Sequence, residues 1–135
     1  MTNEVATHMD IDLDGIKDPN SPAPDGTYKV RVYQADFQES KSSGQEMAVI
    51  SLQLQTSDEH NGKFVRDYVL VNSEDPGQRQ RALWRAREYL KAAGLGLNLK
   101  NWSNLPGAEF SVELREEPPT PQFDRATNRV VRIYE

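Results

Sequence analysis

Residues 27–33 form the alternating sequence Thr27-Tyr28-Lys29-Val30-Arg31-Val32-Tyr33. Tyr28, Val30 and Val32 share one face of an extended chain, because successive side chains of a strand point to opposite sides. The opposite face carries Lys29, Arg31 and Tyr33. The alternation predicts a half-buried β-strand over residues 27–33.

Four further segments predict strands by the same pattern. In residues 48–55, Ala48, Ile50, Leu52 and Leu54 alternate with polar or smaller side chains. The Asn61-Gly62 turn signal then leads into a strand over 63–71, with valines on the core face. Strands are also predicted over 110–115 and 128–134, separated by the Pro-rich break at 118–121.

One helix is predicted over residues 76–93. Asp75 is suited to be its N-cap, Pro76 to be its first residue and Gly94 to end it. Its apolar stripe places Arg81 and Arg85 on the solvent side and Trp84 beside the core. The helix arginines could bind phosphate or a partner protein, or simply form a solvated face.

The order of three strands, a helix and two strands is typical of an OB-fold, a small five-stranded barrel. We therefore expect a mainly β domain, an OB-fold-like barrel, over residues 27–135. The alternative is an open antiparallel sheet with a packed helix. Residues 1–26 lack periodicity and are interpreted as a flexible acidic N-terminal arm.

Composition excludes several classes of protein. The 135 residues favour a single domain and include no cysteine, which rules out disulfides, thiolate metal sites and cysteine nucleophiles. The two histidines are too few for a histidine-rich metal site, so we expect no metal and no cofactor. No apolar run approaches the ~18 residues of a membrane span. The N-terminus has no secretory pattern, which predicts an intracellular protein without a membrane partner.

The net charge of −5 is concentrated at the N-terminus. Residues 1–26 contain six acidic side chains and one lysine, whereas residues 27–135 contain fifteen acidic and fifteen basic side chains. One hypothesis is that the arm competes with nucleic acid for a basic groove. The alternative is a solvated leader.

The outward faces of the first three strands combine aromatic rings with cations. Single-stranded nucleic acid needs this combination, because bases stack on rings and cations track phosphates. The alternative is an ordinary solvated sheet face. Trp102, in a Gly/Asn-rich connection, could stack on a base or pack on the barrel. The candidate nucleic-acid-binding residues are Lys29, Arg31, Tyr33, Lys41, Gln53, Phe64, Arg66, Tyr68 and Trp102.

Several short motifs of the chain occur together in a known pattern. They are Pro22–Val32, Lys41-Ser42 with Gly44, Asn61-Gly62-Lys63, residues 82–95 and Asn128-Arg129-Val130. With these motifs the sequence resembles a family of small bacteriophage proteins, long catalogued as uncharacterised, whose members are described as single-stranded-DNA-binding or recombination-associated. The resemblance implies a protein of the bacterial host's cytoplasm that works in phage DNA replication or recombination, with recombinase or replication proteins as further partners. The sequence departs from the family pattern at 118–127.

Other functions are weaker interpretations. Asp10, Asp12, Asp14 and Gly15 match the first half of a calcium loop, but Ser21 stands where the bidentate Glu belongs. No nucleophile elbow or phosphate loop occurs, so we expect no enzyme. The main alternative to DNA binding is a phage protein-interaction module that binds a host or phage enzyme. Exposed strand edges are also compatible with a homodimer.

Overall fold

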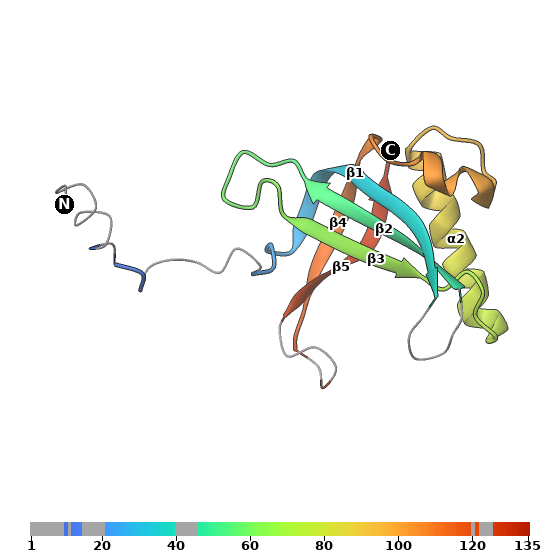
Figure 1. Cartoon of the computed structure of the whole chain (residues 1–135), viewed down its shortest axis with the longest axis horizontal. Coiled ribbons are helices and arrows are strands. Elements are labelled where there is room, and N and C mark those ends of the chain that lie inside the picture. The colour runs from blue at the N-terminus through green and yellow to red at the C-terminus, as the bar shows by residue number, and fades with distance from the viewer. Residues whose placement is uncertain (1–9, 11, 15–20, 40–45, 120, 122–125) are drawn as a thin grey trace, which may run out of the picture.

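The computed structural model describes residue 10 and residues 12–14, 21–39, 46–119, 121 and 126–135. These residues form five strands, one α-helix and one 3-10 helix, and both helices lie beside the sheet (Figure 1). In the described part of the chain, no helix combines the length and apolar character needed to cross a membrane. The elements in chain order are β1 (Gly26–Glu39), β2 (Glu46–Leu54), β3 (Phe64–Val69), α2 (Pro76–Ala92), η1 (Leu99–Asn104), β4 (Glu109–Glu117) and β5 (Thr127–Tyr134).

The strands form one antiparallel sheet in the order β3-β2-β1-β4-β5. The sheet curves enough to bring parts of β3 and β5 near each other. No hydrogen-bonded ladder joins these two edge strands in the described ranges, so the sheet is open rather than a closed barrel. The mainly β class is confirmed and the architecture is consistent with an OB-like fold. The expected barrel closure is wrong, because only a β3–β5 ladder would remove the sheet edges.

β1 is longer than predicted because a bulge resets its alternation. Val32 pairs with Leu52 and Gln34 pairs with Ser51, which leaves Tyr33 as the extra residue. Before the bulge Val30 and Val32 are buried, and beyond it Ala35 is the next buried residue. Because the bulge shifts which positions of β1 face the core, the second half of the strand does not continue the alternation seen in residues 27–33.

A glycine turn supports β1 at this bulge. The Val32 N–H donates to the Ala108 carbonyl over 2.8 Å, and the Gly107 N–H donates to the Val32 carbonyl over 2.8 Å. Gly107 has a φ of 92°, a conformation that side chains with a Cβ adopt rarely. The turn thereby extends the pairing with β1 to the residues just before the start of β4.

The core lies between the inner face of the sheet, α2 and η1. Asp75 caps α2 by accepting from the Gly77 N–H over 3.0 Å, as the sequence predicts. Ala86, Tyr89 and Leu90 are the buried residues of this helix. The Tyr89 ring meets Trp102 of η1 edge-to-face, with centroids 5.9 Å apart.

The packed body begins earlier than residue 27. Ala23 is fully buried, and its backbone exchanges two 2.9 Å hydrogen bonds with the Asn128 side chain. The Asp25 carboxylate accepts from the Glu116 N–H over 2.7 Å. The Lys63 ammonium donates to the Ser21 carbonyl over 2.9 Å. The last residues of the predicted arm are therefore part of the domain.

Candidate nucleic-acid interface

The strand register gathers most of the predicted binding residues on the outer face of β1, β2 and β3. Arg31 lies opposite Gln53, and Gln53 lies opposite Phe64. Further along the strands, Arg66 lies opposite Ser51 and Tyr68 lies opposite Val49. We call this surface the outer face and define it by Lys29, Arg31, Tyr33, Gln53, Phe64, Arg66 and Tyr68.

Three aromatic rings of the outer face remain open to solvent. The exposed fractions are 63% for Tyr33, 52% for Phe64 and 49% for Tyr68. The bulge in β1 brings the Tyr33 ring within 5.1 Å of the Phe64 ring, measured between centroids, at an interplanar angle of 69°. This edge-to-face pair holds both rings on the surface, where each can offer area to a flat ligand.

The cations of the outer face differ in their availability. Arg31 and Arg66 are exposed, and neither forms an ion pair with another residue in the described ranges. Lys29 forms an exposed ion pair with Glu109, with 3.5 Å between the Nζ and Oε2 atoms. Asp36, which accepts from the Gln34 side chain, adds a negative charge in the same row as Tyr68, because both lie opposite Val49. Arg31 and Arg66 are therefore the cations best able to meet a phosphate.

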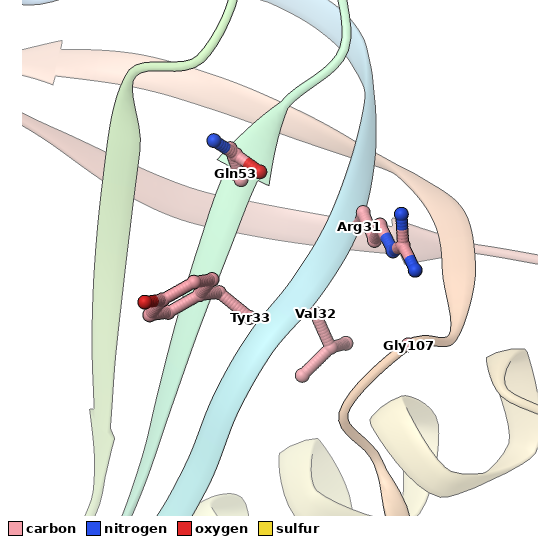
Figure 2. A pocket seen from close by; sticks show the side chains of 5 residues that line it. All are labelled: Arg31, Val32, Tyr33, Gln53 and Gly107. Carbon is pink, nitrogen blue, oxygen red and sulfur yellow. The ribbon is translucent and has the colours of Figure 1, made fainter.

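A hollow of about 330 Å³ lies beside the bulge and is lined by five residues (Figure 2). Tyr33 projects over β2, whereas Arg31 lies on the other side of β1. Val32, Gln53 and Gly107 complete the lining. An aromatic side chain and a guanidinium group thus line this hollow together.

Two of the nine predicted residues do not join this face. Trp102 is fully buried, and its indole N–H donates to the Val49 carbonyl over 3.2 Å. The proposed stacking of a base on Trp102 is therefore wrong, and packing against the sheet is the observed role. Lys41 lies outside the described residues.

A polar cluster behind the outer face escaped the sequence analysis. Asp67, between the outward Arg66 and Tyr68, points inward and is 8% exposed. Its carboxylate accepts from the Arg85 guanidinium over 3.2 Å and from the Tyr89 hydroxyl over 2.7 Å. The prediction that Arg85 faces solvent was wrong, because the Arg85 guanidinium forms an ion pair with Asp67 of β3. The cluster fixes β3 against α2.

Burial and the Asp67 charge raise the pKa of Tyr89 well above its usual value of 10.0. The folded state therefore favours the neutral phenol, whose stabilising contribution is complete below about pH 10 and is lost as pH rises through the higher folded pKa. We expect Tyr89→Phe to flatten the fall in unfolding free energy above about pH 10. Urea titrations across alkaline pH measure this slope. Tyr33→Phe, at an exposed tyrosine, is the matched control, and identical slopes for all three proteins would contradict the assignment.

The comparisons with known proteins give one family. A family model described as "Protein of unknown function (DUF669)" matches residues 9–115. The chain belongs to this family. The DUF669 match includes the acidic residues 10–14 and every element from β1 to η1, together with most of β4. Among curated proteins, none matches the chain.

The calcium-loop interpretation involves Asp10, Asp12 and Asp14 at the start of the DUF669 match. The Asp14 N–H donates to the Asp12 carboxylate over 3.0 Å. Within the described ranges, no three His, Asp or Glu side chains gather in a way that could hold a metal ion. Ile11 and Gly15 of this motif lie outside the described residues.

Proposed function

We propose that this DUF669 protein binds single-stranded DNA without strong sequence preference. The observation that carries the proposal is the exposed Tyr33–Phe64 ring pair with Arg31 and Arg66 beside it on one sheet face. Every base has a π-face, so stacking on these rings would tolerate any sequence, while the arginines would contact phosphates. The role is binding rather than catalysis.

The position of the outer face agrees with this function. In OB-folds, ligands lie across strands two and three and are held by the flanking loops. Here Gln53 of β2 and Phe64, Arg66 and Tyr68 of β3 occupy the corresponding place. The resemblance to phage proteins adds the biological setting, namely coating of single strands during phage replication or recombination in the host cytoplasm.

The first test is fluorescence anisotropy with a labelled oligo-dT, compared with a duplex of the same length at low and higher salt. We expect preference for the single strand. Three phosphate contacts at a slope of about −0.7 each would weaken binding roughly 20-fold when salt rises about fourfold. No binding at low salt, by the full chain or by a chain lacking residues 1–20, would reject the proposal in favour of a protein-interaction module.

Side-chain substitutions locate the interface. Phe64→Ala should weaken single-strand binding by roughly 5- to 150-fold, the effect of losing one stacked base at ~1–3 kcal/mol. Arg66→Ala should lower the magnitude of the salt slope by about 0.7. Tyr134→Ala and Arg132→Ala, exposed residues of β5, are the matched controls. Equal affinities for Phe64→Ala and Tyr134→Ala would show that the outer face is not the binding site.

A further inference from the structure

The outer side of α2 carries an exposed tryptophan. Trp84 is 57% exposed and lies on the side of the helix opposite the buried Ala86, Tyr89 and Leu90. The prediction that it packs beside the core was wrong. We define the Trp84 face as Arg81, Trp84, Arg87 and Lys91, which share one side at helical spacings of three, three and four residues.

The Trp84 face is cationic as well as apolar. The Arg87 guanidinium lies 4.8 Å from the centroid of the Trp84 ring. Arg81 is exposed and forms no ion pair within the described ranges, while Arg87 and Lys91 form only weakly buried pairs with Glu88 and Glu135. α2 as a whole carries five basic residues and one acidic residue. A ligand for this face would therefore supply anionic groups together with an apolar surface.

The N-terminal segment of the chain has this complementary chemistry. Residues 1–20 contain five acidic side chains and one lysine. In the sequence Asp10-Ile11-Asp12-Leu13-Asp14, carboxylates alternate with aliphatic residues. Leu13 is 70% exposed, and Asp12 and Asp14 beside it are also exposed. The chain thus carries an acidic, apolar segment and a cationic, apolar surface, and Leu13 of the first and Trp84 of the second are exposed.

Geometry favours contact between two copies. Ser21 is held by Lys63, just before β3, whereas α2 follows the other end of that strand (Figure 1). The chain from Asp14 to Ser21 spans at most about 25 Å. A surface route to Trp84 must follow β3 for about 20 Å and then pass around a helix about 10 Å wide. Asp14 therefore falls short of the Trp84 face of its own chain. Asp10, at most about 40 Å from Ser21, reaches that face only when the intervening chain is almost fully extended, whereas a second copy can present the whole segment without this stretching.

We propose that the N-terminal acidic segment of one copy binds the Trp84 face of a second copy. The two surfaces differ, so the contact is head-to-tail and leaves a free segment and a free Trp84 face at the two ends. Further copies extend the chain in the same way. The inference stands apart from DNA binding, and its tests contain no DNA.

Tryptophan fluorescence gives a direct readout. The chain has two tryptophans, and Trp102 is fully buried, so iodide or acrylamide quenching reports on Trp84. At low salt we expect quenching to decrease as protein concentration rises, together with an increase in sedimentation coefficient. Deletion of residues 1–20, Trp84→Ala or high salt should abolish the increase in sedimentation. A full chain that sediments as a monomer at every concentration would overturn the proposal.

Charge exchange separates contact between copies from contact within one copy. One variant carries Arg81→Glu and Arg87→Glu, and the other carries Asp10→Lys, Asp12→Lys and Asp14→Lys. Each variant alone should self-associate about tenfold more weakly than the unchanged protein, because the segment and the Trp84 face then carry charges of the same sign. Mixing them should restore association, since each segment then meets an oppositely charged face on the other protein. Absence of restoration would overturn the proposal, as would equal weakening by the charge-matched Arg115→Glu, Arg132→Glu control.

Discussion

Replacing Trp102 by alanine should lower the free energy of unfolding by about 3–5 kcal/mol. Trp102 is fully buried, and its ring meets Tyr89 edge-to-face at 5.9 Å. Alanine would remove this contact and leave a cavity between η1, α2 and the sheet. It would also leave the Val49 carbonyl without the indole N–H that it accepts at 3.2 Å.

Urea unfolding followed by far-UV circular dichroism measures this loss. Trp84→Ala is the matched control, because it deletes the same side chain from an exposed helix position. We expect that control to change the unfolding free energy by no more than about 1 kcal/mol, as a surface substitution does. Similar losses for the two variants would contradict the assignment of Trp102 to the core and Trp84 to the surface.

Replacing Asp67 by alanine should cost about 2–4 kcal/mol of stability. The substitution removes the acceptor of both the Arg85 guanidinium and the Tyr89 hydroxyl. Tyr89 is fully buried, so water cannot replace the lost acceptor for its hydroxyl. The Arg85 side chain is 34% exposed and can be partly hydrated, which keeps the loss below that of a fully buried ion pair.

A double-mutant cycle with Tyr89→Phe isolates the hydroxyl–carboxylate interaction. Because Tyr89→Phe removes the stranded hydroxyl, the double variant should be more stable than the sum of the two single losses predicts. Asp36→Ala, at an exposed aspartate of β1, is the matched control and should have little effect. Strict additivity in the cycle would show that Asp67 and Tyr89 do not interact energetically.

The sequence predicts the parts of this fold that depend on local pattern. The alternation of residues 27–33 and 48–55 and the Asp75 cap identify the strands and the helix, because each signal lies within a few residues. The features that required tertiary contacts were missed. The bulge at Tyr33 is set by pairing with two neighbouring strands and by Gly107, and the open edges of the sheet depend on how far its curvature extends.

In the candidate site, too, the features set by local pattern could be predicted and those set by tertiary contacts could not. Alternation correctly places Arg31, Phe64, Arg66 and Tyr68 outward, because the direction of a strand side chain is local. The burial of Trp84 was harder to predict, since a helical stripe does not show how much of a helix the neighbouring elements cover. Trp102 lies in a connection where no periodic pattern indicates burial. A charged Asp67 on an inward position was the available signal for a buried partner, but its partners Arg85 and Tyr89 are eighteen and twenty-two residues away.

The two hydrogen bonds between Ala23 and Asn128 have a consequence for the order in which the domain folds. These residues are 105 positions apart, and both hydrogen bonds use the same asparagine side chain. During synthesis the Ala23 segment is made long before Asn128 leaves the ribosome. The two hydrogen bonds between them therefore cannot form until the last strand has been synthesised. Contacts between such distant positions slow folding, because the intervening loop must close first. The N-terminal edge of the domain is thus completed only when β5 has been synthesised.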